Sequence, residues 1–221
     1  MKFLRNIVLV LALPLCSIAQ VHTNETSFGF ETSIPLLDKL SADFEADMKF
    51  THPFFLLKSH SQEIGFGYSA SKSIKIGAAY SLTHRLYDQG FFPRHKMSVN
   101  LRYRYRYKYI RFDYRNKSEM SRNSYTNDAG DLLFDFVNRN RIKVSYRRKK
   151  LWWEPNITLE TFHPLVNTSI YALSEIRYSA AVSFKILKTL KFDVGYTYKQ
   201  TLKSSVPKTV SGLSFIVIKD F

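Results

Sequence analysis

The chain has 221 residues, a formal charge of +15 and 15% aromatic residues. Its single cysteine, Cys16, lies within the first 19 residues, so the rest of the chain has no thiol for a disulfide, a thiolate metal site or a cysteine nucleophile. The excess of positive charge favours anionic partners, and the predicted export signal at residues 1–19 argues against nucleic acid.

Residues 1–19 are expected to be a secretory signal peptide. Lys2 and Arg5 form a basic start, residues 7–15 are apolar, and Ser17-Ile18-Ala19 is a small-residue cleavage site. The apolar run is too short to span a bilayer as a helix. We therefore expect cleavage near Ala19 and export of the remaining chain.

Polar and apolar residues alternate through most of the chain after this signal. Between residues 40 and 50, the even positions from Leu40 to Phe50 are apolar, and the odd positions from Ser41 to Lys49 are polar. A period of two places one set on each face of a β-strand. Strands of soluble proteins average about 5–6 residues, whereas a tilted membrane-spanning strand needs about 9–11. The long runs here predict an all-β, membrane-spanning, antiparallel up-and-down barrel.

Ten alternating runs can be traced in chain order, and their connections differ in length. The runs cover residues 40–50, 62–70, 74–84, 96–106, 110–120, 134–146, 152–162, 175–187, 190–200 and 209–221. Short connections are expected at 71–73, 107–109, 147–151 and 188–189, and longer polar ones at 51–61, 85–95, 121–133, 163–174 and 201–208. Outer-membrane barrels have an even strand number, short periplasmic turns and longer external loops. Ten strands with both chain ends in the periplasm satisfy this rule.

The N-terminal segment, residues 20–39, complicates the strand number. Residues 28–34 also read as a strand, joined to the next run by a turn through Asp38 and Lys39. Counting this strand gives eleven, an odd number that would force a parallel closing pair. Residues 20–39 could instead form an extra edge or plug before a barrel at 40–221, or 20–27 could supply a twelfth strand. We expect ten strands, with twelve as the alternative.

Across six of the predicted strands, the apolar face carries no charge. A Lys or Arg that faces lipid at the membrane midplane costs about 2–4 kcal/mol, so an uncharged face is what a bilayer requires. The alternative is a soluble barrel or sandwich that hides this face in its core. The outward set includes Ile64, Phe66, Tyr68, Ile74, Ile76, Tyr80, Val99, Leu101, Tyr103, Tyr105, Ile110, Phe112, Tyr114, Ile176, Tyr178, Val182, Phe184, Ile186, Leu190, Phe192, Val194, Tyr196 and Tyr198.

The C-terminal strand resembles the assembly signal of bacterial outer-membrane proteins, which end on an aromatic residue. Phe215, Val217 and Phe221 match that pattern, whereas Ile216 stands where a glycine is usual and Lys219 occupies the penultimate outward position. The resemblance implies that the barrel-assembly machinery and outer-membrane lipids are partners of the chain.

Several loose motifs also resemble those of a known family. They are the Ala19-Gln20 junction, the arginine-alternating stretch 94–106 with 109–115, the stretch 140–146, Trp153-Glu154-Pro155 leading to residues 160–165, and the final strand. In these the mature chain resembles DUF2490, a family of Bacteroidota outer-membrane β-barrels of unknown function. The resemblance implies architecture and location, and it implies no chemistry.

The inward positions of the predicted strands carry the charge. A basic wall consists of Arg102, Arg104, Arg106, Arg111, Arg115, Lys117, Arg139, Arg141, Lys143 and Arg147. An acidic wall consists of Asp43, Glu45, Asp47 and Glu63. We expect the two walls to face each other across a narrow interior. They could interlock and fill a closed structural barrel, or the surplus of basic groups could line a narrow conduit that favours small anions.

An enzymatic role is a further alternative, and we do not favour it. His52, His60, His84, His95 and His163 fall in or beside the predicted external connections, with Ser59, Ser61, Ser81 and Asp88 nearby in sequence. Lipid hydrolysis or acyl transfer at the rim would need a hydroxyl, a base and an orienting group within hydrogen-bond reach. No fixed motif marks such a trio, and no histidine spacing indicates a metal or a cofactor.

Overall fold

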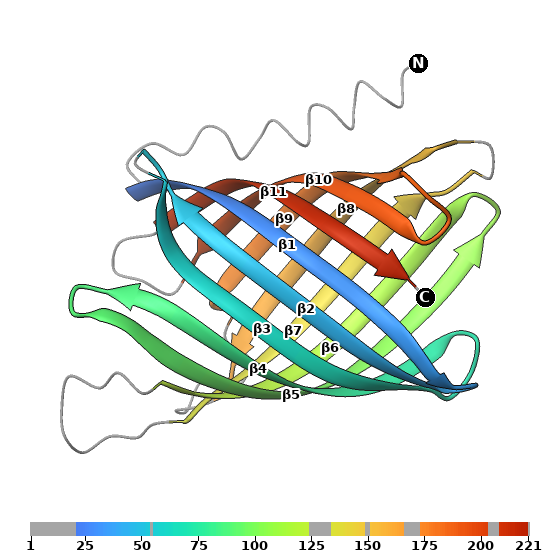
Figure 1. Cartoon of the computed structure of the whole chain (residues 1–221), viewed down its shortest axis with the longest axis horizontal. Helices are drawn as coiled ribbons and strands as arrows, with labels where there is room; N and C mark the ends of the chain where they lie inside the picture. The colour runs from blue at the N-terminus through green and yellow to red at the C-terminus, as the bar shows by residue number, and fades with distance from the viewer. Residues whose placement is uncertain are drawn as a thin grey trace.

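The computed structural model describes residues 21–53, 55–123, 134–148, 151–165, 173–202 and 208–220. The predicted signal peptide and Phe221 lie outside these residues. The described part forms one closed β-barrel (Figure 1). It contains no helix that is long and apolar enough to cross a membrane.

The barrel wall consists of eleven strands, which confirms each of the ten predicted runs and adds one. The strands are β1 (Val21–Leu37), β2 (Leu40–Thr51), β3 (Leu56–Ser69), β4 (Ile74–Tyr87), β5 (Gly90–Tyr107), β6 (Ile110–Asn123), β7 (Phe134–Tyr146), β8 (Trp153–Pro164), β9 (Glu175–Lys185), β10 (Leu190–Thr201) and β11 (Lys208–Asp220). Neighbours in sequence pair antiparallel around the wall.

The predicted number of strands, ten with twelve as the alternative, is wrong. Residues 21–37 form a single long strand, so the polar residues 21–27 are the first half of β1 and supply no separate partner. β1 closes the barrel by pairing in parallel with β11, from Val21 opposite Lys208 to Ser33 opposite Asp220. An odd number of strands makes this parallel seam unavoidable, because the first and last strands then run in the same direction.

The start of the first strand and the end of the last strand lie at opposite ends of the barrel. This corrects the expectation that both chain ends lie on the periplasmic side. The end with the β2–β3, β4–β5, β6–β7, β8–β9 and β10–β11 connections is called the loop end here, and the other end the turn end. β1 starts at the loop end, and β11 finishes at the turn end (Figure 1).

The lengths of the connections differ less between the two ends than predicted. The expected long connections at 51–61 and 85–95 are wrong, because residues 52–55 join β2 to β3 and residues 88–89 join β4 to β5. Their polar residues extend the strands instead. Gly90 begins β5 with a φ of 122°, a conformation that residues with a Cβ rarely adopt, and so permits the tight β4–β5 turn. The longest connections are 124–133 and 165–174.

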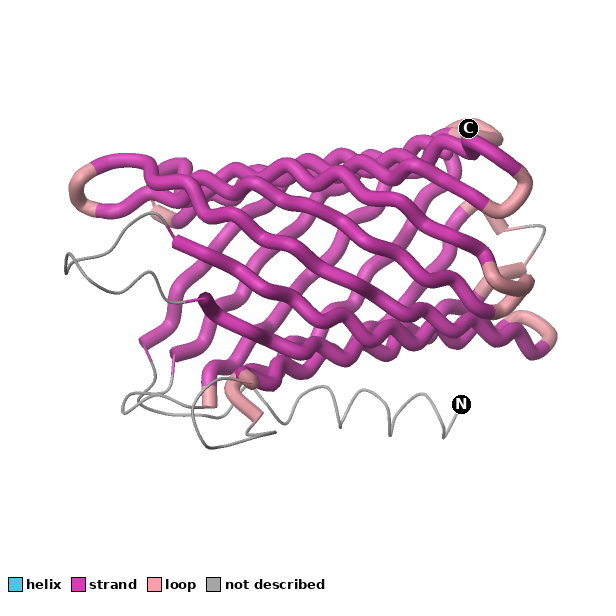
Figure 2. The backbone as a smooth tube through the Cα atoms, turned by 90° about the horizontal axis from the view of Figure 1, so that it is seen from below, coloured by secondary structure: helices cyan, strands magenta, loops and turns pink. Residues whose placement is uncertain are grey.

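The strands cross the barrel diagonally (Figure 2). When the paired residues are followed from strand to strand once around the barrel, the path returns to β1 about 14 residues away from its starting residue. This shear corresponds to a strand tilt of about 40–45° from the barrel axis. This tilt is typical of outer-membrane barrels. With strands about 4.8 Å apart, the backbone lies about 11 Å from the axis. Long side chains from opposite walls can therefore meet near the middle.

Burial is inverted relative to a soluble protein. None of the apolar side chains in the described ranges is buried, whereas charged residues such as Lys117, Glu160 and Asp193 are. Most of the predicted outward residues are exposed, with Ile64 at 56% and Val99 at 60%, and the others, which lie on β9 and β10, are half-buried. The alternative of a soluble fold with these residues in its core is therefore wrong, and hydrocarbon is the medium that would suit this face.

Candidate functional site

Charged residues of the basic wall lie side by side on the inner face of β6 and β7. The register places Lys117 directly opposite Arg139, and Arg115 directly opposite Arg141. Like charges that face each other across a strand pair are destabilising. Carboxylates close to these pairs therefore stabilise the inner face of the two strands.

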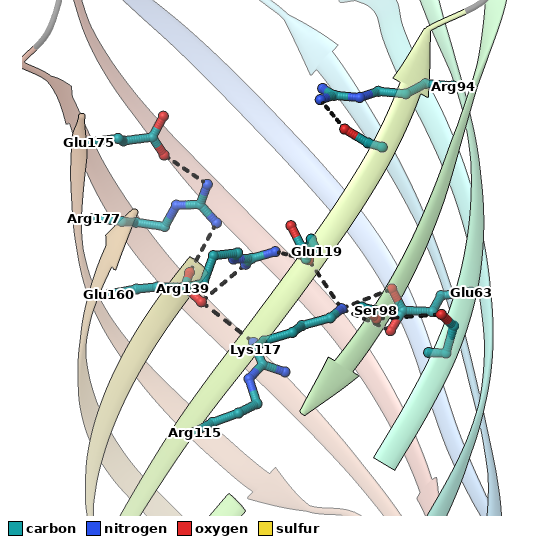
Figure 3. Close-up of polar contacts among 12 residues, drawn as sticks. Glu63, Arg94, Ser98, Arg115, Lys117, Glu119, Arg139, Glu160, Glu175 and Arg177 are labelled. Carbon is teal, nitrogen blue, oxygen red and sulfur yellow. Dashed lines mark hydrogen bonds and ion pairs between the residues drawn. The ribbon is translucent and has the colours of Figure 1, made fainter. Parts of the chain in front are cut away.

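A carboxylate from across the lumen supplies part of this compensation. Lys117 of β6 donates to Glu63 of β3, with Nζ 3.1 Å from Oε1 and 3.2 Å from Oε2 (Figure 3). Two other strands separate β3 from β6 in the wall, so this ion pair bridges the interior. The same ammonium group lies 3.3 Å from Oε1 of Glu119 on its own strand.

The contacts continue from Glu119 to β7 and β8. Arg139 binds Oε1 of Glu119 at 2.7 Å and Oε1 of Glu160 at 3.0 Å (Figure 3). Glu160 of β8 also lies 3.4 Å from both Arg115 of β6 and Arg177 of β9. One carboxylate thus serves three guanidinium groups, with only 6% of its side chain exposed.

The same chain of contacts reaches β10. Arg177 binds Glu175 at 3.2 Å, and Lys199 of β10 binds the other oxygen of Glu175 at 2.8 Å. The ring of Phe162 lies 4.8 Å from the guanidinium carbon of Arg139 and 4.9 Å from that of Arg177. Such cation–π contacts stabilise the guanidinium groups further. The connected residues are named the central ion-pair layer here: Glu63, Arg115, Lys117, Glu119, Arg139, Glu160, Glu175, Arg177 and Lys199.

The rest of the predicted basic wall lies on the turn-end side of this layer. Arg102 and Arg104 share Asp113, at 3.6 and 3.4 Å. Arg147 binds Glu154 of β8 at 3.0 Å. The remaining four members form no ion pair with any described residue. They are Arg106, Arg111, Arg141 and Lys143.

The predicted acidic wall meets the basic wall directly at Glu63 alone among the described residues. Asp43 binds Lys75 of β4 at 2.9 Å and accepts a hydrogen bond from Ser33 at 2.5 Å. Asp47 lies 3.4 Å from Lys49 of its own strand. Elsewhere the two walls do not pair across the lumen as expected. The arginines of the basic wall instead form ion pairs with carboxylates on β6 and β8, which lie next to them.

The carboxylates and cations of β8, β9 and β10 were missed in the prediction from sequence. Glu154 and Glu160 are the most important omissions, because they neutralise the basic wall. Both are at even positions of β8, in phase with each other, and the register puts Glu160 opposite Arg141. The alternation used elsewhere was the signal that could have found them.

The loop-end histidines and serines lie on opposite faces of the wall. Stacked rings of His60 and His84 lie 4.7 Å apart, and His95 shares a 2.6 Å hydrogen bond with the hydroxyl of Tyr80. These positions share the phase of the outward residues, whereas Ser59, Ser61 and Ser81 share the inward phase of Glu63. No cluster of three metal-binding residues occurs among the described residues.

The assembly-signal residues lie on the outer face of the parallel seam. Phe215 stacks on Phe28 of β1, with ring centroids 5.4 Å apart, and on Phe192 of β10 at 6.3 Å. Val217 is exposed beside them. Phe221 lies outside the described residues, so its predicted role stays a prediction.

Comparison with known proteins supports the architecture. A family model described as "Protein of unknown function (DUF2490)" matches residues 26–209. The NanC porin resembles the structure with a TM-score of 0.51 at 13% identity, covering 79% of this chain and 86% of that one. The β domain of the Bordetella autotransporter BrkA gives a TM-score of 0.47 at 10% identity, covering 81% and 82%. No curated protein matches the chain. The attribution to Bacteroidota stays a prediction.

Proposed function

Because the chain belongs to the DUF2490 family of proteins of unknown function, which carries no assigned activity, we propose a function from the barrel itself. The protein is an outer-membrane barrel with a porin-like fold, and its lumen is closed by its own side chains. Its partners are outer-membrane lipids and the barrel-assembly machinery, and it needs no cofactor.

The observation that carries this proposal is the central ion-pair layer. Its contacts form one connected set from β3 to β10, and the side chain of Lys117, which reaches across the interior, is only 7% exposed. Side chains fill the interior of narrow barrels. A solute that crosses this level must separate ion pairs that are largely shielded from water, and leaving a buried charge without its partner costs about 3–5 kcal/mol.

The outer face supports a location in the membrane. The exposed residues on the outside of the strands are mostly apolar or aromatic, including Leu101 and Ile142 in mid-strand and Tyr107 and Tyr146 at the turn end, and exposed polar residues such as His95 and Arg122 lie near the loop end. Outer-membrane barrels carry such an apolar band, flanked by aromatic girdles at both interfaces. The predicted signal peptide would direct the chain to that membrane.

Single-channel recording in planar bilayers tests the closed lumen. We expect the folded wild-type protein to be silent and the double variant Arg139→Ala/Glu160→Ala to conduct, because it removes the centre of the layer. Glu45→Gln is the matched control, since Glu45 faces the interior and forms no ion pair with a described residue. Folding of each variant is checked by the mobility shift on heating in mild-detergent gels. Steady conductance of the wild type would overturn the proposal.

A narrow conduit that favours anions is the second candidate function. It is favoured by Arg141 and Lys143, which lie on the turn-end side of the layer without an ion pair to any described residue. Rings of Arg or Lys serve anion pores. Under a potassium chloride gradient, this conduit would give a reversal potential of anion selectivity that falls in Arg141→Gln/Lys143→Gln. A silent wild type rejects it.

A further inference from the structure

A second concentration of positive charge lies at the turn end, away from the central ion-pair layer. A cavity of about 600 Å³ opens there between the end of β5, the start of β6, the β7–β8 connection and the end of β9. It is named the turn-end basic pocket here. Its lining residues are Arg106, Lys108, Tyr109, Ile110, Arg111, Arg147, Arg148 and Lys185.

Carboxylates are scarce around this pocket. Six of its eight lining residues are cationic. Glu154 is the carboxylate in contact with them, and it is already bound by Arg147 at 3.0 Å and by Lys185 at 2.7 Å. Among the described residues, no carboxylate forms an ion pair with Arg106 or Arg111.

Pairs of cations that face each other across neighbouring strands are neutralised in the central ion-pair layer but not in the turn-end basic pocket. In the central layer, Lys117 faces Arg139, and Glu119 binds both, at 3.3 and 2.7 Å. In the turn-end basic pocket, Arg106 faces Arg111 across β5 and β6 with no carboxylate between them. The Nε of Arg111 is buried without a hydrogen-bond partner. A bound anion here would do what Glu119 does in the layer.

We propose that the turn-end basic pocket binds a phosphate group, with Arg106 and Arg111 as its principal ligands. Guanidinium groups present a planar set of donors that matches phosphate oxygens in a bidentate manner. The volume exceeds what one phosphate fills, so the ligand is a phosphate attached to a larger group.

Two sources of such a group are compatible with the position of the pocket. A soluble organic phosphate could enter through the turn-end mouth. A phospholipid headgroup could reach it over the rim, where Lys108 lies 5.4 Å from the ring of Tyr107 and Arg148 lies 5.9 Å from that of Tyr109. These tyrosines are exposed, as is Trp152, and aromatic residues of this kind mark the headgroup level of a barrel.

The chain has intrinsic tryptophan fluorophores close to this pocket. Its only two tryptophans are Trp152 and Trp153. The backbone carbonyl of Trp152 accepts a 2.8 Å hydrogen bond from the amide of Lys185, which lines the pocket. Because Trp152 is one backbone hydrogen bond away from a lining residue, we expect its fluorescence to change when the pocket is occupied.

The first arm of the experiment titrates glycerol 3-phosphate into the protein folded in zwitterionic detergent, at constant ionic strength set with chloride. We expect a saturable fluorescence change, with affinity at least tenfold weaker in Arg106→Gln/Arg111→Gln. Arg94→Gln is the control, because it removes a lumen-facing cation at the loop end, where Arg94 binds Asp135 at 3.1 Å. A mobility shift on heating confirms that each variant is a folded barrel.

The second arm places the same proteins in nanodiscs of phosphatidylcholine with or without phosphatidylglycerol. A lipid ligand would raise the temperature of the mobility shift with phosphatidylglycerol in the wild type and in Arg94→Gln, and not in the double variant. Saturation in the first arm identifies a soluble phosphate, and a response in the second arm alone identifies a headgroup. Absence of both responses, or equal responses in the double variant, would overturn the proposal.

Discussion

The inner faces of two opposite parts of the barrel wall differ in the size and the pairing of their side chains. On β6 to β9, named the crowded wall here, a carboxylate such as Glu160 binds three guanidinium groups. On β11 and β1, named the thin wall, the inward positions include Gly29, Gly212 and Ser214. Glu31 of β1 has no ion pair with a described residue. The ion pairs between arginines and carboxylates are therefore concentrated on one side of the lumen.

This difference supports the closed lumen that we propose, in which side chains of the described strands fill the interior of the eleven-stranded barrel. The backbone lies about 11 Å from the axis, so arginine and lysine side chains extending from one wall reach far across when the facing residues are small. Glycine also lets the backbones come close, as at Gly212, where an added Cβ would lie 2.6 Å from the carbonyl oxygen of Glu25 across the seam. The small inward residues Gly29, Gly212 and Ser214 of the thin wall leave room for the long charged side chains of the crowded wall.

The largest expected effect comes from breaking the crowded wall at Glu160. Glu160→Gln leaves three guanidinium groups without their shared carboxylate, in a place where its side chain is 6% exposed. We expect a loss of about 3–5 kcal/mol in the free energy of unfolding, measured by urea titration in detergent. Glu45→Gln, on the opposite side of the barrel, is the control and should lose far less. Equal losses would mean that the layer contributes nothing beyond a single charge.

The outer face of the crowded wall provides the next test. Ile142 of β7 lies between the inward residues Arg141 and Lys143 and pairs with the outward residues Tyr114 and Leu159. Ile142→Arg should cost about 2–4 kcal/mol in lipid, because it places a charge against hydrocarbon near mid-height. The measurement is the denaturant midpoint in vesicles, with Ile142→Leu as control. If the arginine were tolerated there, the outer face would not be facing lipid.

These two faces were predictable from the sequence because the period of a strand is local. The side chain of Ile142 must point away from those of Arg141 and Lys143 whatever the rest of the chain does. For the same reason the ten predicted runs hold in the structure. The charged character of the interior follows from the same alternation.

The strand number and the ion-pair partners were not predictable in this way. The parallel pairing of β1 with β11 joins residues 187 positions apart, such as Val21 and Lys208, and no local pattern encodes it. The partner of a lumen cation also depends on register and tilt. Lys117 pairs with Glu63 three strands away, whereas Arg139 finds Glu160 on the adjacent strand.

A smaller effect is expected from filling the thin wall at the parallel seam. Gly212→Ala would place its Cβ against the backbone of Glu25, which can relieve the overlap only by moving the strand. We expect a loss of about 1–3 kcal/mol, typical of overpacking, seen as a lower temperature of the gel mobility shift. Gly29→Ala is the matched control, because its Cβ would lie 3.4 Å from Ile216, an ordinary contact. A drop of the same size in both variants would argue against close packing at residue 212.

The smallest effect is expected for the ion pair between Lys49 and Asp47, which lies outside the central ion-pair layer. Its N–O distance is 3.4 Å, and its side chains are 44% and 33% exposed, so water screens the attraction. Lys49→Gln should change the free energy of unfolding by less than about 1 kcal/mol. Reversal of the pair by Lys49→Asp/Asp47→Lys should be equally mild, in contrast to Glu160→Gln, in the same urea titration. A loss of unfolding free energy from Lys49→Gln as large as that from Glu160→Gln would show that stability depends only on the number of charges in the lumen. The difference between buried ion pairs that share a carboxylate and isolated, solvent-exposed ion pairs would then have no effect on stability.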